Sequence, residues 1–259
     1  ALRQLLAAGA DPNESTGSTA AADWPTPLLW AIRRRRSRAH IAALLDAGAE
    51  PTATTADGCS AYVLALRFGL GDVAELLRAS GIEERVSTEE AFVAACGSGD
   101  EDAARRIQAD RPDLPAALTD KQLRLLPELA ANDCVEAVRL MVELGWPIAT
   151  RGGDWEASAL NHAVFKGNAA LTRFLLERGA TWTEEHGFGD NACGTLGWAS
   201  VNEPVAGGDW VGCARALVEH GMPAGHPDPA GSGAIVIDGR LRTFSDEVEE
   251  FLAGTHAAS

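Results

Sequence analysis

The strongest constraint on the fold of this chain is a short sequence phrase that recurs along its length. The phrase holds two apolar residues, two variable residues and a glycine; it ends at Gly9, Gly48, Gly81, Gly145, Gly179 and Gly221, with one residue more before Gly81. Because glycine readily takes the left-handed conformation that closes a helix, each copy predicts a helix end. The glycines stand 39, 33, 64, 34 and 42 residues apart, and since 64 is twice 32 we expect a further copy, without its glycine, at 106–109.

A second phrase precedes these ends by about 20 residues and predicts the start of a partner helix. Its copies begin at Thr26, Ser60 and Ser158, and each is followed by an apolar run. A hydroxyl side chain caps a helix N-terminus, and Pro27 has the backbone angle that a first helical residue needs. The repeating unit is therefore turn, helix, tight turn, helix, which predicts an all-α solenoid.

The two phrases resemble those of ankyrin repeats. Residues 26–28 read Thr-Pro-Leu, like the family's Thr-Pro-Leu-His opening, and residues 9–13 read Gly-Ala-Asp-Pro-Asn, like its Gly-Ala-Asp-x-Asn ending. The resemblance covers about residues 1–225 and implies an ankyrin-type solenoid of about six to seven helix-turn-helix repeats. Only the second helix of the first copy is present, so we expect that repeat to be incomplete.

Departures from the repeat divide the chain. Residues 85–146 are the least regular, and Pro127 stands where a first helix is expected, so that helix breaks or kinks unless the proline lies in its first turn. After residue 225, an Asp-Gly pair at 238–239 predicts a small hairpin and Ser245 predicts the start of a short helix. We expect a repeat stack over 1–225 and a capping hairpin and helix over 226–259, which covers the last apolar face.

Composition excludes several classes of partner. The chain holds 22 basic and 37 acidic side chains, a net charge of −15, so general binding to nucleic acid or to an anionic membrane is not expected. Apolar stretches are shorter than the roughly 18 residues of a membrane span. Five scattered cysteines, an odd number, predict reduced thiols in a cytoplasmic protein. Without metal-ligand spacing or a phosphate-binding loop, we expect no metal and no cofactor.

The interval between Gly179 and Gly221 holds two insertions, at 181–193 and 201–209. Insertions in repeat arrays form loops on one face, which is often the binding face. Adjacent carboxylates in sequence do not suit acid and base roles, so we expect no catalytic site. The alternative is a small-molecule binder or an enzyme that uses these loops. Its polar groups would be His186, Asp190, Asn191, Cys193 and Asp209. The walls of its pocket would be Trp182, Phe188 and Trp210.

Residues 33–38 hold five arginines in this acidic chain. Such a run has three possible interpretations. It is typical of an exposed helix end, of a nuclear-localisation or nucleic-acid-binding signal, or of part of a binding groove. The ankyrin resemblance implies that first-helix ends and turn tips line a concave binding face. The residues it places there are Asp23, Arg33, Arg34, Asp57, Arg67, Phe68, Trp155, Phe165, Lys166, Asp190, Asn191 and Trp210. A basic groove predicts an acidic or phosphate-bearing partner at the 33–38 end.

The tryptophans fall into two groups by position. Trp30 and Trp198 lie inside expected first helices and are predicted to pack against the next helix, whereas Trp155 and Trp210 lie in turns and are predicted to contact a partner. Taken together, these features predict a non-catalytic, monomeric protein–protein interaction module that acts as an adaptor or an inhibitor.

Overall fold

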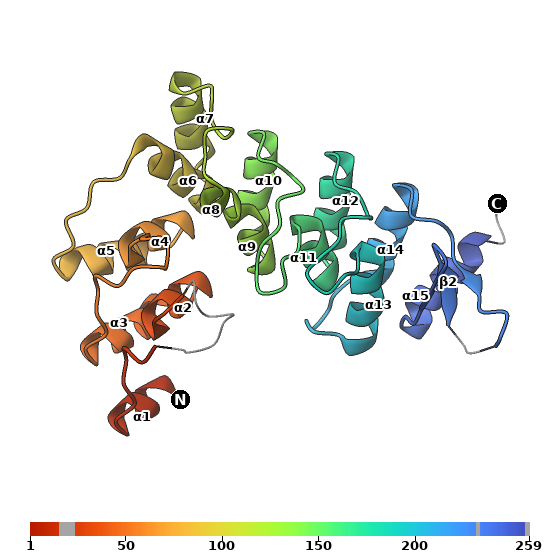
Figure 1. The fold of residues 1–259 in the computed structure, drawn as a ribbon, viewed down its shortest axis with the longest axis horizontal. Coiled ribbons are helices and arrows are strands. Elements are labelled where there is room, and N and C mark those ends of the chain that lie inside the picture. Colours follow the sequence, from red (N-terminus) through yellow and green to blue (C-terminus); the bar gives the residue numbers. More distant parts are fainter. Residues whose placement is uncertain (16–23, 232–233, 257–259) are drawn as a thin grey trace. The chain divides into compact units, whose positions relative to one another are not determined.

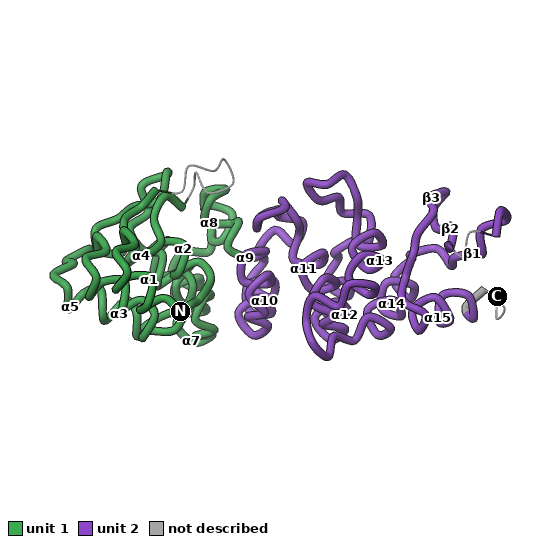
Figure 2. Tube along the Cα trace, turned by 90° about the horizontal axis from the view of Figure 1, so that it is seen from below, with its two compact units in different colours: residues 1–125 green, residues 126–259 purple. Residues whose placement is uncertain are grey.

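The structure, a computed structural model, describes residues 1–15, 24–231 and 234–256 of the chain. These residues divide into two compact units, Ala1–Leu125 and Leu126–Ser259, which Figure 2 shows in different colours. The division falls inside the segment that the sequence marks as irregular. The predicted boundary after residue 225 stays a prediction. No helix of the described residues is long and apolar enough to cross a membrane.

Unit 1 is a two-layer stack of helix pairs (Figure 1). Its first helices α2, α4 and α6 pack on one another in order, while the second helices α1, α3 and α5 form the other layer. Within each pair, α2 packs on α3, α4 on α5 and α6 on α7. The bounds are α1 Leu2–Ala7, α2 Pro27–Arg33, α3 Arg38–Asp46, α4 Ala61–Arg67, α5 Gly71–Ala79, α6 Thr88–Ser98, α7 Glu101–Asp110 and α8 Asp120–Leu123.

Unit 2 repeats the same arrangement. The first helices α11 and α13 pack together, and the second-helix layer runs from α10 through α12 and α14 to α15 (Figure 1). The bounds are α9 Leu125–Ala131, α10 Val135–Glu143, α11 Ala159–Phe165, α12 Ala169–Glu177, α13 Ala192–Asn202, α14 Trp210–Glu219 and α15 Asp246–His256, with the strands β1 His226–Pro227, β2 Ile235–Ile237 and β3 Arg240–Arg242.

Helix boundaries follow the two sequence phrases. The side chains of Thr26, Ser60 and Ser158 accept hydrogen bonds from backbone N–H groups in the first turns of α2, α4 and α11. Gly48 and Gly179 follow α3 and α12 with φ of +93° and +101°, angles that a residue with a Cβ adopts only with strain. Each closes its helix, because the next N–H returns to a carbonyl in the last turn.

The irregular segment keeps the repeat with local changes. Residues 106–109, which lack the closing glycine, lie in α7 as expected. The helix around Pro127 is broken: α8 ends at Leu123 and α9 begins at Leu125, so the proline lies in the first turn of α9. A proline is tolerated there because its missing N–H has no partner inside the helix.

The C-terminal segment caps the second-helix layer of unit 2. Strands β2 and β3 form the predicted hairpin, and β1 adds a third, antiparallel strand that the sequence did not reveal. Helix α15 packs on α14 and β1 and buries Val248 and Leu252. The predicted fold class, a solenoid of helix-turn-helix repeats with a small hairpin-and-helix cap, is confirmed in its architecture.

Candidate interaction surface

Five aromatic rings in unit 2 form a continuous row, here called the aromatic strip: Trp155, Phe165, His186, Phe188 and Trp198. The Trp155 ring lies 4.9 Å from the His186 ring and 5.7 Å from the Phe165 ring, measured between centroids. At one end His186 meets Phe188 at 6.0 Å, and at the other Phe165 and Trp198 stack at 5.5 Å with their planes 9° apart. Contacts of this geometry hold each ring in a fixed orientation.

The strip is assembled from two first helices, a turn and the first inserted loop. Phe165 is the last residue of α11, and Trp198 lies on α13, which packs beside α11. Trp155 lies in the turn before α11, which is closed by backbone pairing of Gly152 with Ala157. The loop reaches this turn directly, because the N–H of Gly187 donates to the carbonyl of Trp155 at 2.8 Å. The repeat therefore brings segments that are distant in sequence into one surface.

The two ends of the strip are open to solvent, whereas His186 within it is 7% exposed. Phe188 is 80% exposed and Trp198 is 54% exposed, while Trp155 and Phe165 are half-buried. The prediction that Trp198 packs against the next helix is therefore wrong. The buried side of α13 is formed by residues such as Leu196, Ala199 and Ser200, and Trp198 points off that side. No sequence signal marks this exposure, because Trp198 and the exposed Val201 are apolar and three residues apart, a spacing that predicts a buried helix face.

An ion pair ties the inserted loop to the C-terminal hairpin. Both oxygens of Asp190 accept hydrogen bonds from the guanidinium of Arg242 on β3, one of them at 2.7 Å. Burial raises the pKa of Asp190, but the bonds from Arg242 and from the N–H of Asn191 outweigh it, so this pKa lies below its usual value. The Asp190 carboxylate therefore fixes the loop that carries His186 and Phe188 to strand β3.

The polar side chains of the inserted loops have separate structural roles. Asn191 caps α13 and Asp209 caps α14. Cys193 is 1% exposed, and burial raises the pKa of its thiol to about 11, so it is not a thiolate at neutral pH. Burial also lowers the pKa of His186, which favours the neutral ring. No cluster of three or more His, Cys, Asp or Glu side chains suited to a metal ion occurs among the residues described.

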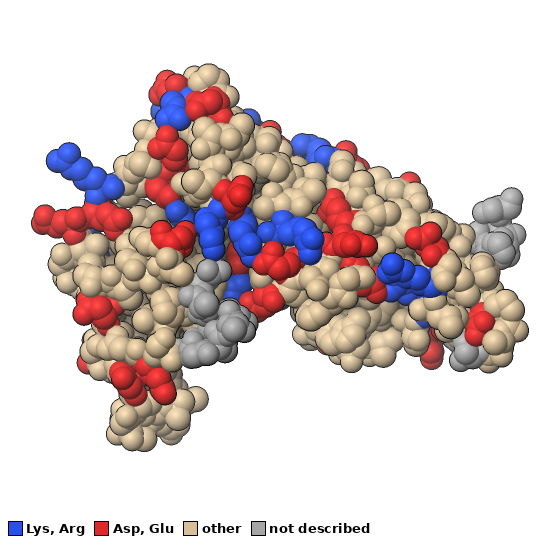
Figure 3. All heavy atoms as spheres, in the orientation of Figure 1, with Lys and Arg blue, Asp and Glu red and all other residues tan. Residues whose placement is uncertain are grey.

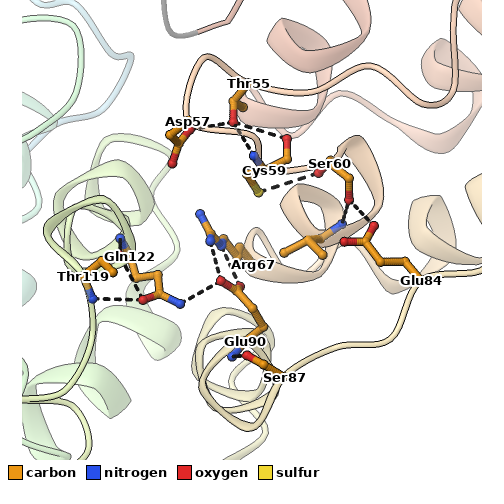
Figure 4. Close-up of polar contacts among 11 residues, drawn as sticks. Thr55, Asp57, Cys59, Ser60, Arg67, Glu84, Ser87, Glu90, Thr119 and Gln122 are labelled. Carbon is orange, nitrogen blue, oxygen red and sulfur yellow. Dashed lines mark hydrogen bonds and ion pairs between the residues drawn. The ribbon is translucent and has the colours of Figure 1, made fainter.

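In unit 1 the predicted site residues Arg67 and Asp57 are held by hydrogen bonds in two separate groups (Figure 4). The guanidinium of Arg67 faces Glu90 on α6 and donates two hydrogen bonds to it, one of them at 2.8 Å. Gln122, on α8, donates to the same carboxylate at 2.7 Å. Asp57 accepts from the hydroxyl of Thr55 at 2.6 Å. Burial lowers the pKa of Arg67, but the hydrogen bonds to Glu90 together with the negative charge of Glu90 and other nearby groups raise it more, so this charge is held and neutralised inside the unit.

The remaining predicted residues differ in how much surface they offer. Arg33 is 4% exposed and lies over the rings of Trp24 and Trp30, at 5.0 and 5.2 Å from their centroids. Phe68 and Trp210 are buried, at 2% and 8% exposure. Arg34 is exposed; Lys166, Asn191 and Asp190 are half-buried, and Asp57 is exposed. Asp23 lies outside the described residues.

Charges of both signs are interleaved on the surface. On the face shown in Figure 3, the lysine and arginine side chains have acidic side chains beside them. The ion pairs of Arg111 with Glu89 and Asp113, and of Arg173 with Glu219, are examples within each unit.

Comparisons with known proteins give matches among solved structures only. No protein-family model and no curated protein matches the sequence. The crystal structure of the human ASB11 ankyrin repeat domain is 19% identical over 85% of this chain and 92% of that chain, with a TM-score of 0.39. The ankyrin repeat domain of Bcl-3, described as a unique member of the IkappaB protein family, is 22% identical over 78% of this chain and 89% of that chain, with a TM-score of 0.40.

Proposed function

We propose that this ankyrin-type stack is a non-catalytic module that binds a protein partner through the aromatic strip. The observation that carries the proposal is the exposure of Phe188 and Trp198, 80% and 54%, at the two ends of a row of rings in mutual contact. Exposed large apolar side chains that adjoin one another are typical of interaction sites. The same surface serves an adaptor or an inhibitor equally well.

The strip suits a partner protein for two physical reasons. Tryptophan and other aromatic residues are enriched among the side chains that dominate binding energy at interfaces. Their orientation is also fixed before binding, because Phe165 stacks on Trp198 and Trp155 contacts both histidine and phenylalanine rings. Little side-chain entropy is then lost when the complex forms, which leaves more of the contact energy for affinity.

The test is affinity capture from a lysate of the source organism, with the wild-type chain beside a Phe188→Ala, Trp198→Ala double variant. Captured proteins are identified by mass spectrometry, and the leading one is purified and titrated against both chains. We expect the double variant to bind this partner at least about tenfold more weakly, since each ring is placed as an interface anchor.

Leu5→Ala is the matched control, because Leu5 is 60% exposed and lies on α1, outside the strip. It should bind the partner as the wild type does. Circular dichroism of the double variant should match that of the wild type, since both side chains project into solvent. Equal binding by the wild type and a folded double variant would contradict the proposal.

A second proposal concerns the arginine segment at 33–38. Arg34, Arg36 and Arg38 are exposed, whereas Arg35 donates a hydrogen bond to the carbonyl of Phe68 and Arg33 is buried. We propose that the exposed Arg36 and Arg38 bind an acidic or phosphate-bearing segment of a partner. Titration with a phosphoserine peptide should give binding that Arg36→Gln with Arg38→Gln abolishes, and an unchanged affinity would count against it.

The cysteines and the net charge support a proposal for the compartment and the oligomeric state of the chain. None of the five cysteines forms a disulfide: Cys96, Cys193 and Cys213 are buried, and Cys59 and Cys134 are partly buried. Free thiols are typical of a reducing compartment, so we propose that the chain meets its partner in the cytoplasm, as a monomer. A net charge of −15 opposes self-association at neutral pH.

A further inference from the structure

An open groove of about 580 Å³ lies in unit 2 beside the aromatic strip. It is formed by the C-terminal end of α13, the residues that lead into α14 and the N-terminal end of α15. The second insertion, 201–209, supplies part of its wall, while no residue of 181–193 lines it. The groove is therefore a feature of the C-terminal cap rather than a pocket closed by both inserted loops.

The groove has an apolar floor. Trp210, Phe244 and Val248 line it and are 8%, 4% and 1% exposed. The indole Nε1–H of Trp210 is buried and has no hydrogen-bond partner among the described residues.

The rim of the groove is acidic. Glu203, Asp209, Asp246 and Glu247 are exposed and line it. Among the described residues, none that lines the groove is a lysine or an arginine. The rim therefore attracts a cation, and the net charge of −15 adds to that attraction at longer range.

The groove and the aromatic strip are joined on α13. Val201 lines the groove, is 51% exposed and lies three residues after Trp198, hence on the same helix face. One extended segment can therefore contact the end of the strip and continue into the groove. The surface offered to it changes along its length from aromatic to acidic.

We propose that the groove takes a basic segment of the protein partner, with a lysine or arginine next to an apolar residue. This inference rests on the proposed function, because it names the partner chemistry at the end of the same surface. Lysine and arginine side chains suit both parts of the groove. Their methylene stems pack on the apolar floor formed by Trp210 and Phe244, while their charged ends reach the carboxylates of the rim.

The probe is a random peptide library displayed on phage and selected on the immobilised full chain. Enriched peptides are synthesised with a fluorescent label, and their dissociation constants are measured by fluorescence polarisation at low and high salt. We expect enrichment of lysine or arginine beside an apolar residue, and weaker binding at high salt because the rim charges are screened.

A pair of charge variants locates the binding site. Glu203→Gln with Glu247→Gln removes two rim charges and should weaken binding of the enriched peptides about tenfold. The matched control is Glu136→Gln with Glu177→Gln, which removes the same charge from exposed positions on α10 and α12 that do not line the groove. The control pair should bind within about twofold of the wild type, as expected for charges remote from the contact.

Three results would overturn the inference: no enrichment, enrichment of peptides without basic residues, or equal weakening by both pairs of variants. These failures are distinguishable from failure of the proposed function. Peptides without basic residues whose binding is lost in Phe188→Ala with Trp198→Ala would leave the aromatic strip as a binding surface and remove only the basic segment. Binding that survives both the strip variant and the rim variant would contradict both proposals.

Discussion

The ends of α4 in unit 1 and α11 in unit 2 occupy the same place in the repeat but present opposite surfaces. Helix α4 ends in Arg67 followed by Phe68, and α11 ends in Phe165 followed by Lys166. In unit 1 the aromatic ring is buried and the charge is paired with Glu90. In unit 2 the aromatic ring is half-buried and stacks on an exposed tryptophan.

The neighbouring first helix makes the difference. Helix α6 packs on α4 and places Glu90 against Arg67, while α13 packs on α11 and places Trp198 against Phe165. The two charged groups of an ion pair bind each other and are not available to a partner protein. In a stack of two rings, the outer face of one ring stays open to solvent and can contact a partner. The repeat thus fixes where a side chain lies, and the next repeat decides whether it is available to a partner.

The largest expected effect separates the two phenylalanines. Phe68→Ala should lower the free energy of unfolding by about 3–5 kcal/mol, because the ring is fully enclosed and its removal leaves a cavity. Phe165→Ala should cost only about 1 kcal/mol, since that ring is half-buried and water fills the space. Urea denaturation of each variant gives both values. Similar losses for the two variants would show that the ends of α4 and α11 do not differ in packing as described.

A second, smaller effect tests the ion pair of unit 1. The side chains of Arg67 and Glu90 are 13% and 16% exposed, so Glu90→Ala leaves a largely desolvated guanidinium without its partner. We expect a loss of about 2–4 kcal/mol and faster amide hydrogen exchange in α4 and α6.

Glu101→Ala is the control for that variant. Glu101 pairs with Arg105, but these side chains are 59% and 49% exposed, so the loss should stay below about 1 kcal/mol. Equal losses in the two variants would mean that Arg67 is hydrated well enough to do without Glu90, and the contrast between the units would then rest on the phenylalanines alone.

The sequence predicted the helix boundaries better than it predicted which side chains are exposed. The caps at Thr26, Ser60 and Ser158 and the closing glycines are local signals, so the helices and their pairing could be predicted from them. Trp198 and Trp210 show the limit. Trp198 was expected inside and is 54% exposed, whereas Trp210 was expected at the surface and is 8% exposed.

Both tryptophans depend on segments that are distant in sequence. Trp210 begins α14 and shares its surroundings with residues 243–248 of the C-terminal cap, whose position no local pattern encodes. The pairing of Arg67 with Glu90 spans 23 residues and depends on how α6 stacks on α4. Helix ends are set by neighbouring residues, but exposure is set by tertiary contacts, which is why the candidate site was predicted only in part.

The smallest expected effect concerns how firmly the aromatic strip is held. Asp190→Asn removes the charge that Arg242 binds, and we expect a loss of about 1 kcal/mol, because the Asp190 side chain is 29% exposed and solvent screens part of the attraction. The loop 186–193 should exchange its amide hydrogens faster, as measured by mass spectrometry. Glu185→Gln, an exposed charge on the same loop, should leave this exchange unchanged.

The pH dependence of this effect identifies the carboxylate as its source. The pKa of Asp190 in the folded chain lies below its ordinary value of 3.8, so the ion pair contributes its full stability above that pH. As the pH falls below 3.8, the unfolded chain takes up the proton first, and the contribution is lost as the pH passes the folded pKa. The difference between the wild type and Asp190→Asn should therefore be constant near neutral pH and shrink in acid. A difference that persists unchanged at low pH would mean that the carboxylate holds the loop by its shape rather than by its charge, and the firm attachment of His186 and Phe188 would need another cause.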